Sequence, residues 1–388
     1  MKFPIQTIGI IGGGQLARMS AQAAQRLGFK VVVLDTDPDG PAAQVTPHRV
    51  AGRYDDLAAL QELASKCDVI TLEHEWVNPA HFRVLEDAGA QVFPSSKTLT
   101  YLTDKFIQRQ QFALNGLAGP EGALVTDMQQ AKTLGAVWGY PLVLKARHGG
   151  YDGYGVEIVW SEKEWDEKLP VEPQDWYAEQ FVAFDRELAV MVARGKDGQV
   201  AAYPVVESVQ TFDGHRCDTV VAPAPELSES VRHNARWAAV AAVEAVDGVG
   251  LFGVELFLTR DGSVLINEMA PRPHNSGHFT MDCCATSQFE QHIRAVCGLT
   301  LGPTHLLAGG AAMANLLGTK TGDFSPGAGV ARATAAVPGA HVHWYGKSQT
   351  RAGRKMGHIN MLGDSPKAAL EQALRAREAF WTEEADNG

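Results

Sequence analysis

The sequence predicts an α/β protein whose N-terminal part is a Rossmann-like open parallel sheet and whose C-terminal part is α+β. Three observations lead to this prediction. Apolar strand-like runs alternate with amphipathic helical segments over the first hundred or so residues. The chain has 388 residues, which is too long for one small core and indicates two or three domains. Towards the C-terminus, two β-prone runs flank an Asp-Gly pair, as is typical of a hairpin.

The composition describes an acidic globular protein. Apolar residues make up 45% of the chain, and the net charge of −11 argues against non-specific binding of nucleic acid. The five cysteines form no CxxC pair, which excludes a thiolate zinc site on spacing and favours a reducing compartment, the cytoplasm. We expect no signal peptide and no apolar run of membrane-spanning length.

The first βαβ unit carries a glycine turn. We expect its strand, helix and second strand over residues 7–12, 16–27 and 30–34. Gly12, Gly14 and Ala17 fit the dinucleotide fingerprint, and Asp35 supplies an acid about twenty residues further on. Taken alone, the unit favours a nicotinamide or flavin enzyme. The alternative is that such a turn serves any anion or polar ligand, because helix N-termini bind anions in general.

Further alternation of helices and strands extends the N-terminal sheet. The expected elements are a helix at 57–66, a strand at 69–72, a helix at 79–88 and a strand at 91–93. The Glu-His-Glu run at 73–75 follows a strand, at the edge where open parallel sheets bind ligands. A solvated acidic loop is an equally good interpretation of this run. Ser95 or Ser96 then caps a long helix at 97–114 that carries Lys105.

A second α/β segment brings a lysine next to a glycine-rich loop. After a helix at 128–134, an apolar strand at 140–145 ends in Lys145, and the loop at 149–155 contains four glycines. The amides of such a loop can cover phosphates while the lysine counters their charge. The spacing does not match GxxxxGK[ST], which excludes a P-loop enzyme. The alternative is a flexible hairpin tip, but phosphate binding is the favoured interpretation.

Two further strands frame an apolar slot suited to a purine. The first, at 176–182, carries Glu179, and the second, at 186–192, carries Glu187, which could reach ribose hydroxyls. The sheet and a covering amphipathic helix are expected to continue at 200–209 and 228–246.

The hairpin at 251–270 predicts a metal site. With Asp261-Gly262 as a two-residue loop, Glu255 lies directly opposite Glu268. Two partly buried like charges repel each other across a sheet. A hard divalent cation would offset this repulsion through the carboxylate oxygens, which it can share with phosphates, and Asn267 could add a neutral oxygen. The alternative is a register off by one that leaves one glutamate solvated.

Cationic and polar side chains follow the hairpin. Arg272, His274 and Asn275 lie in a proline-stiffened loop, and a guanidinium matches planar oxyanions with two hydrogen bonds. A cation site followed by an oxyanion cradle predicts phosphoryl transfer to a small anion. Nearer the C-terminus, a basic, glycine-containing turn at 347–355 indicates a phosphate on a second substrate. A solvated basic loop is the alternative there.

Motifs spread over the whole chain together resemble a known family. Lys145, the glycine loop, the EQFV run at 179–182, Glu187 and the Glu255/Glu268 pair resemble the ATP-grasp superfamily. The stretches GGGQLARM, GGYDGYG, NEMAPRPHNSGHFT and RKMGH occur in this order and are similar to the 5-(carboxyamino)imidazole ribonucleotide synthases. The resemblance covers nearly the whole chain.

The resemblance implies a three-domain ATP-grasp architecture. Its domains would be a Rossmann-like domain at 1–100, a linker helix and small lid at 101–183, and a C-terminal ATP-grasp domain at 184–388. The implied reaction is the carboxylation of 5-aminoimidazole ribonucleotide by bicarbonate, through carboxyphosphate, with ATP and Mg²⁺, in de novo purine biosynthesis. The resemblance further implies a cytoplasmic homodimer that binds neither nucleic acid nor membrane.

The resemblance also assigns roles to residues. ATP would be held by Lys105, Lys145, Gly150, Tyr151, Asp152, Gly153, Glu179, Gln180, Phe181, Val182, Glu187, Asn267 and Glu268, and Mg²⁺ by Glu255 and Glu268. Bicarbonate and carboxyphosphate would meet Arg272, His274 and Asn275, with Glu73 facing them. The imidazole and its amine would meet Tyr151 and Asp152, with Asp152 the candidate proton acceptor. The ribonucleotide would contact Gln15 and Leu16, and its phosphate Lys347, Arg354 and Lys355.

Two positions depart from the family pattern, and three other functions compete. Tyr154 and Lys105 both stand where an arginine is frequent in the family.

One rival is a formate-dependent glycinamide ribonucleotide transformylase of the same superfamily. A second, from a different class, is an NAD(P)-dependent oxidoreductase built on the glycine turn, which leaves Lys145 and the Glu255/Glu268 pair unexplained. A third is a nucleotide-binding protein without catalysis.

Overall fold

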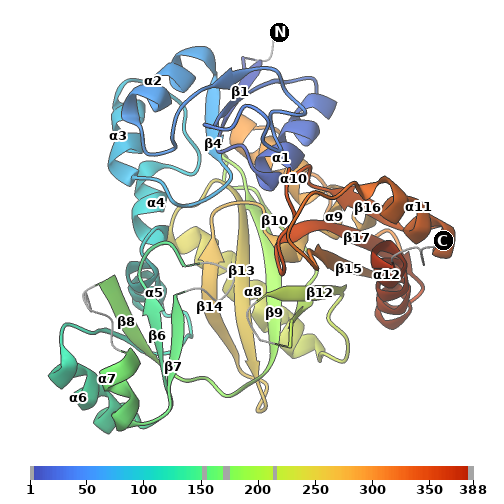
Figure 1. Ribbon diagram of the computed structural model, residues 1–388. Helices are drawn as coiled ribbons and strands as arrows, with labels where there is room; N and C mark the ends of the chain where they lie inside the picture. The colour runs from blue at the N-terminus through green and yellow to red at the C-terminus, as the bar shows by residue number, and fades with distance from the viewer. Residues whose placement is uncertain (1–3, 151–154, 169–174, 213–215, 383–388) are drawn as a thin grey trace.

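Three β-sheets organise the protein, for which a computed structural model describes residues 4–150, 155–168, 175–212 and 216–382. In Figure 1 the N-terminal sheet lies at the top and a small sheet, β5 to β8, at the lower left. The long strands of a third sheet run between them, and the C-terminal helices lie on the right. The mixed α/β class and the N-terminal parallel sheet are as predicted.

The N-terminal sheet is parallel and has the strand order β3-β2-β1-β4. Its strands and helices are β1 (Thr7–Ile11), α1 (Gln15–Arg26), β2 (Lys30–Leu34), β3 (Arg49–Val50), α2 (Leu57–Lys66), β4 (Val69–Leu72) and α3 (Pro79–Asp87). The strand expected at 91–93 is reduced to one bridge between Val92 and Ile70. Helix α10 (Gln288–Cys297), from far along the chain, covers one face: Ile293 and Val296 share a core cluster with Ile8.

The prediction of a single long helix at 97–114 is wrong. The segment forms two helices, α4 (Ser96–Leu102) and α5 (Lys105–Leu114), with Ser95 as the N-cap of the first. Asp104 breaks the helix because its backbone is extended and its carboxylate accepts hydrogen bonds from the first amides of α5. The other carboxylate oxygen accepts from Arg147, which directly follows β6 (Leu142–Ala146). Lys105 therefore begins a helix and does not lie in the middle of one.

The small sheet is antiparallel and is covered by short helices. Its strands are β5 (Gly122–Leu124), β6 (Leu142–Ala146), β7 (Val156–Val159) and β8 (Trp176–Gln180), in the order β5-β8-β6-β7. Its helices are α6 (Met128–Trp138), the 3₁₀ turn η1 (Glu162–Glu164) and α7 (Trp165–Lys168). Trp165 is fully buried in the core between the helices and the sheet.

The third sheet has nine strands and is antiparallel throughout. They are β9 (Phe184–Arg194), β10 (Val200–Ala202), β11 (Val206–Gln210), β12 (Cys217–Ala222), β13 (Gly250–Thr259), β14 (Val264–Ala270), β15 (Gly310–Leu317), β16 (His341–Trp344) and β17 (Lys355–Gly363). The helices around it are α8 (Glu229–Ala245), η3 (Asn275–Gly277), α9 (Thr280–Cys283), α11 (Pro326–Ala336) and α12 (Pro366–Trp381). The run expected at 200–209 splits into β10 and β11. The predicted domain boundaries stay a prediction.

The β13–β14 hairpin places Glu255 opposite Glu268, as expected, but by a different route. Gly262 has a positive φ of 84°, and the Thr259 amide donates to the Ser263 carbonyl, so the turn is not a two-residue loop. The longer turn shifts the pairing register by one position, and a β-bulge between Leu256 and Glu255 shifts it back. Asn267 is the extra residue of that bulge.

Among the helices of the described ranges, none is both long enough and apolar enough to span a bilayer.

Candidate active site

A cavity of about 450 Å³ lies between the small sheet and the large sheet. Its walls come from β6, β7 and β8 on one side and from β9, β13, β14 and the loop after β14 on the other. The predicted site residues that line it are Lys105, Lys145, Gly150, Glu179, Gln180, Phe181, Val182, Glu187, Glu255, Asn267, Glu268, Arg272, His274, Asn275 and Lys355. Tyr151, Asp152, Gly153 and Tyr154 lie outside the described residues.

Lys145 and Glu179 meet at the floor of the cavity, on adjacent strands of the small sheet. The Lys145 Nζ is 2.7 Å from Glu179 Oε2 and donates to Asn267 Oδ1 at 3.0 Å. Glu179 is almost fully buried, which by itself would raise its pKa, but Lys145 and Arg109 outweigh burial and lower it. The lysine thus joins the small sheet to the bulge of β14.

Glu187 lies on β9 at the side of the cavity and is oriented by Gln210, a residue to which the sequence analysis assigns no role. Gln210 of β11 donates from Nε2 to Glu187 Oε2 at 2.6 Å. Burial raises the pKa of Glu187 despite this hydrogen bond. Both side chains line the cavity, so a neutral amide holds the carboxylate in place without cancelling its charge.

The carboxylates of Glu255 and Glu268 have opposite electrostatic environments. Lys105 forms an ion pair with Glu268. Glu268 is also desolvated, but the attraction of Lys105 and Lys145 lowers its pKa to about 2. Desolvation and the nearby Glu268 charge raise the pKa of Glu255 to about 8. The pair therefore carries one negative charge near neutral pH, and only one of its members has a lysine partner among the described residues.

The donor set at this pair fits a magnesium ion that shares its ligands with a nucleotide. Two carboxylates and the Asn267 amide oxygen are the hard oxygen ligands that Mg²⁺ takes, and Mg²⁺ commonly completes its shell with phosphates and water. In the described part of the chain, no group of three or more His, Cys, Asp or Glu side chains has the arrangement of a metal centre. The predicted metal roles of Glu255 and Glu268 stay a prediction.

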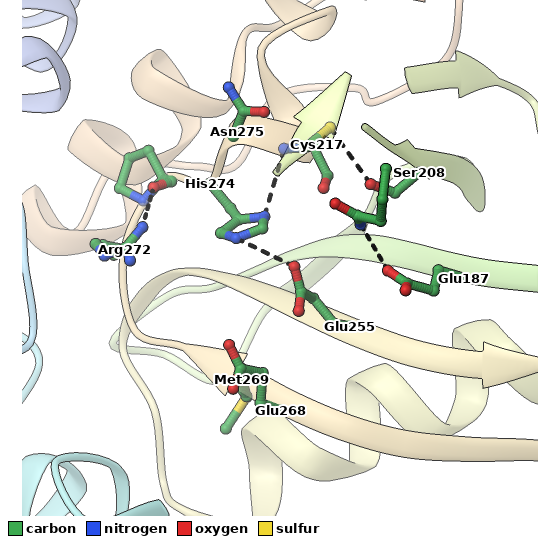
Figure 2. A network of polar contacts seen from close by, with 12 residues as sticks. Glu187, Ser208, Cys217, Glu255, Glu268, Met269, Arg272, His274 and Asn275 are labelled. Atoms are coloured by element: carbon green, nitrogen blue, oxygen red, sulfur yellow. Dashed lines mark hydrogen bonds and ion pairs between the residues drawn. The ribbon is translucent and has the colours of Figure 1, made fainter. Parts of the chain in front are cut away.

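The loop after β14 places Arg272 and His274 at one end of the cavity. Arg272 pairs with Glu75, from Nε to Oε2 at 2.6 Å. Burial opposes the charge of Arg272, but Glu75 outweighs it and raises the pKa of the guanidinium. Figure 2 shows His274 facing Glu255, with Glu268 on the neighbouring strand, and the His274 Nε2 lies 3.4 Å from Glu255 Oε1. Burial and the charges of Arg272 and Lys355 lower the pKa of His274 to about 4, so the imidazole is neutral at pH 7.

Asn275 is held by a second buried amide. Asn275 Nδ2 donates to Asn315 Oδ1 at 3.0 Å, and Asn315 Nδ2 donates back to Asn275 Oδ1 at 2.8 Å. Asn315 also donates to the Cys217 carbonyl. This reciprocal pair fixes both amide orientations because neither side chain can rotate without losing two hydrogen bonds.

Glu73 does not line the cavity but closes the glycine turn. Its Oε1 accepts from the Gly14 amide at 2.6 Å, and its Oε2 accepts from the Ala17 amide at 2.9 Å. A Cβ on Gly12 would lie 2.5 Å from the Glu73 side chain, so the glycine is needed for this close approach. The anion expected at this helix N-terminus is therefore a carboxylate of the protein itself. The acidic residue of the 73–75 run that does line the cavity is Glu75.

The basic turn near the C-terminus lies next to the loop that follows β2. Lys347 donates from Nζ to the Lys355 carbonyl at 2.5 Å, and Arg354 donates to the Gln349 carbonyl at 2.8 Å. Gln44 donates to the Gly346 carbonyl at 2.6 Å and so links the turn to the loop after β2.

Gln15 and Leu16 begin α1 on the same side of the molecule as this turn. Leu16 packs on a cluster that contains Tyr345, two residues before Lys347. Neither Gln15 nor Leu16 lines the cavity, nor do Lys347 and Arg354. The ribonucleotide roles of these residues stay predictions, although Lys355 does reach the cavity wall.

Family models match three successive parts of the chain. Residues 5–102 match the ribonucleotide synthetase preATP-grasp domain, and residues 110–289 match the ATP-grasp domain. Residues 311–372 match the phosphoribosylaminoimidazole carboxylase C-terminal domain. Together with the cavity between two antiparallel sheets, these matches define an ATP-grasp enzyme.

Individual relatives narrow this class. The N5-carboxyaminoimidazole ribonucleotide synthase of Mycobacterium tuberculosis is 42% identical over 96% of this chain and 87% of its own length. The crystal structure of the synthetase from Thermotoga maritima, 42% identical, superposes with a TM-score of 0.86 over 97% of this chain and 98% of that one. The chain belongs to the family of N5-carboxyaminoimidazole ribonucleotide synthases.

Two solved complexes and two longer relatives extend this comparison. Structures of the Aspergillus clavatus enzyme, one with ATP and one with ADP and 5-aminoimidazole ribonucleotide, have TM-scores of 0.88, identities of 34% and 32%, and cover 98% of this chain and 99% of theirs. The proteins named phosphoribosylaminoimidazole carboxylase from Ogataea methanolica and Schizosaccharomyces pombe are longer. This chain is 41% and 40% identical to them and spans 67% and 66% of their length.

Proposed function

We propose that this chain carboxylates 5-aminoimidazole ribonucleotide with bicarbonate at the expense of ATP. The products are N5-carboxyaminoimidazole ribonucleotide, ADP and phosphate, and the reaction belongs to purine biosynthesis. One observation carries the proposal: a single cavity joins the lysine and carboxylates of an ATP-grasp site to Arg272, His274 and Lys355. Family membership and the complex of the Aspergillus clavatus enzyme with ADP and 5-aminoimidazole ribonucleotide support it.

The first step is phosphoryl transfer to bicarbonate. A bicarbonate oxygen attacks the γ-phosphorus of ATP, the bond to the β-phosphate oxygen breaks, and carboxyphosphate and ADP form. Mg²⁺ bound at Glu255 and Glu268 would supply charge neutralisation on the phosphate oxygens. Lys145 offers a further N–H towards the phosphates, since only two are used in its contacts with Glu179 and Asn267 among the described residues. Arg272 and neutral His274 would orient the planar anion.

The second step forms the carbon–nitrogen bond. The exocyclic amine nitrogen attacks the carboxyphosphate carbon, the carbon–oxygen bond to phosphate breaks, and phosphate leaves. The amine loses a proton in this step, for which Asp152 remains the predicted acceptor. Because carboxyphosphate is short-lived, the cavity must exclude water, and we propose that the nucleotide binds between the lid and the C-terminal domain.

The proposal is tested by measuring phosphate release from Mg-ATP and bicarbonate, with and without 5-aminoimidazole ribonucleotide, while following loss of the imidazole amine. Phosphate release that is strongly accelerated by the ribonucleotide, in step with loss of the amine, is expected. ATP left intact under both conditions would refute the proposal. Replacing bicarbonate by formate and the ribonucleotide by glycinamide ribonucleotide tests the transformylase, and a hydride-transfer assay with NADPH tests the oxidoreductase.

Asp152→Asn tests the predicted proton acceptor. Carboxylation is expected to fall by about two to four orders of magnitude, as for loss of a general base, while ATP binding persists. Near-normal turnover would remove Asp152 from the mechanism.

We further propose a homodimer in a reducing compartment, the cytoplasm. The cysteines of the chain are all unpaired, as expected where thiols are kept reduced. Light scattering on the purified chain measures the oligomeric state, and a monomer mass would contradict the dimer.

A further inference from the structure

Arg109 is a buried guanidinium behind the cavity wall that the mechanism above does not use. It lies on α5 and is only 6% exposed. Its Nε donates to Glu179 Oε1 at 2.9 Å, and its two terminal nitrogens donate to the carbonyls of Ile266 at 2.6 Å and Asn267 at 2.5 Å. One side chain therefore joins the linker helix, the small sheet and the hairpin strand β14.

The two carbonyls that Arg109 binds are those of the bulge. In a regular strand, successive carbonyls point in opposite directions, so one planar guanidinium cannot bind both. The extra residue at Asn267 turns them to the same side. The same bulge restores the register that sets Glu268 opposite Glu255. Arg109 thus stabilises the local geometry on which the carboxylate pair depends.

Arg109 also determines how Lys145 is used. Glu179 Oε1 is engaged by Arg109 and by the Tyr177 hydroxyl at 3.0 Å, whereas Oε2 contacts Lys145. With Oε1 neutralised by the guanidinium, Lys145 is not drawn wholly onto the glutamate and keeps its hydrogen bond to Asn267. Without the guanidinium, Lys145 would be the remaining cation that pairs with a buried carboxylate.

The backbone beside Arg109 leaves just enough space for the guanidinium. A Cβ added to Gly119 would lie 2.3 Å from an Arg109 terminal nitrogen and 3.0 Å from the Ile266 carbonyl oxygen. The Ile266 amide donates to the Ala118 carbonyl, so the linker backbone follows the edge of β14 here. A methyl group at Gly119 would displace the guanidinium without altering its charge.

We propose that Arg109 is the positioning residue that couples nucleotide binding at the small sheet to magnesium binding at the hairpin. The inference rests on the proposed function, because the nucleotide and magnesium sites are proposals themselves. One guanidinium holds both the Glu179 carboxylate at the small sheet and the two carbonyls of the bulge, so a ligand that stabilises one set of contacts also stabilises the other. Each ligand then raises the affinity for the other by the same factor. Arg109 itself touches neither ligand.

The coupling is measured with ADP as the probe, which avoids turnover. The dissociation constant of ADP is determined by calorimetry at saturating Mg²⁺ and in excess chelator, and their ratio gives the coupling factor. Arg109→Lys keeps the charge but cannot bind two carbonyls and a carboxylate together. We expect the ratio to fall by about tenfold, a typical size for such coupling. ADP affinity in chelator should change by less than about threefold.

Gly119→Ala is the second variant and keeps the test valid if Arg109→Lys does not fold. It should reproduce the loss of coupling with Arg109 still present. Gly327→Ala is its matched control, because a Cβ there meets nothing within 4 Å. Arg186→Lys controls for a partly buried arginine that also binds a glutamate and a carbonyl, outside the cavity lining.

The outcomes separate the inference from the proposed function. Unchanged ratios in folded Arg109→Lys and Gly119→Ala would overturn the role of Arg109 while the wild-type enzyme still turns over. Equal losses of ADP affinity with and without Mg²⁺ would also overturn it, since a purely structural role predicts that result. If wild-type ADP binding does not respond to Mg²⁺ at all, the proposed metal site fails, and the coupling role fails with it.

Discussion

Two carboxylate environments in this protein differ in how their negative charge is satisfied. Glu73, at the glycine turn, accepts two hydrogen bonds from backbone amides at 2.6 and 2.9 Å. Glu255 and Glu268 face each other across a hairpin, and desolvation and mutual repulsion raise the pKa of Glu255 to about 8. Backbone amides satisfy the first carboxylate, whereas in the second environment only Glu268 has a lysine partner among the described residues.

This difference shows which kind of feature marks a ligand site. The glycine turn matches a well-known nucleotide fingerprint, yet the anion position at its helix is taken by the protein itself. The hairpin carries no nucleotide fingerprint, but the unfavourable electrostatics of its two opposed glutamates indicate a ligand. An unsatisfied physical requirement is therefore the better guide here.

The largest expected effect is on catalysis at the hairpin. Glu268→Gln removes a proposed metal ligand and the partner of Lys105, and phosphate release should fall by about three orders of magnitude, equivalent to ~4 kcal/mol. Steady-state phosphate release at saturating Mg-ATP measures this loss. Glu229→Gln is a matched control, since that side chain is 89% exposed and, among the described residues, pairs with Arg232 on its own helix. A Glu268→Gln enzyme with near wild-type turnover would remove the hairpin from the mechanism.

The next effect is on stability at the glycine turn. Glu73→Gln removes the charge that the amides of Gly14, the N-cap of α1, and of Ala17 in its first turn share, and the free energy of unfolding should fall by about 1–2 kcal/mol. Urea denaturation of wild type and variant measures the difference. The specific activity of the folded variant tests the predicted catalytic role of Glu73 separately. An unchanged midpoint would mean that the turn does not depend on its carboxylate.

Glu255→Gln should raise the stability of the protein, in contrast to Glu73→Gln, and the size of this gain should depend on pH. The pKa of Glu255 is raised from its ordinary 4.5 to about 8 in the folded protein, so its unfolded form ionises first as the pH rises. The metal-free enzyme therefore loses stability between pH 4.5 and 8, and the variant does not. We expect the variant to melt about 2–4 °C higher above pH 8, with the gap closing towards pH 4.5.

Magnesium provides the control for the stabilisation expected in Glu255→Gln. Mg-ADP should stabilise the wild-type enzyme by mass action and the Glu255→Gln variant much less. A melting difference that is the same at every pH from 4.5 to 9 would show that ionisation of Glu255 is not its cause.

The smallest expected effect concerns Glu187, whose carboxylate environment lies between those of Glu73 and of the Glu255/Glu268 pair. Glu187 has one neutral partner, Gln210, at 2.6 Å. Gln210→Ala should raise the KM for ATP about fivefold, ~1 kcal/mol, with kcat unchanged, because the orientation of Glu187 is lost but its charge remains. If Glu187 binds the ribose, the difference between the KM values for ATP and dATP should become smaller as well. An unchanged ratio of these two KM values would exclude that Gln210 acts by orienting Glu187 towards the ribose.

Local rules determined much of the fold from the sequence alone. The bounds of β2, α2 and β4 are as expected, because apolar periodicity and terminal capping act over a few neighbouring residues. The opposition of Glu255 and Glu268 was also correct, although by two compensating register shifts at the turn and the bulge. Many of the side chains at motif positions line one cavity, whereas Glu73, Gln15, Leu16, Lys347 and Arg354 do not, and the roles of all of them stay predictions.

Only the tertiary structure decided which residues support these side chains. Arg109 meets Glu179 and Ile266 across 70 and 157 positions, and Arg272 meets Glu75 across 197. The break at Asp104 and the bulge at Asn267 likewise depend on partners from elsewhere in the chain, Arg147 just after β6 and Arg109 on α5. Sequence patterns report the preferences of near neighbours, whereas a buried charge is stabilised by whatever distant group the packing of sheets brings within hydrogen-bonding distance.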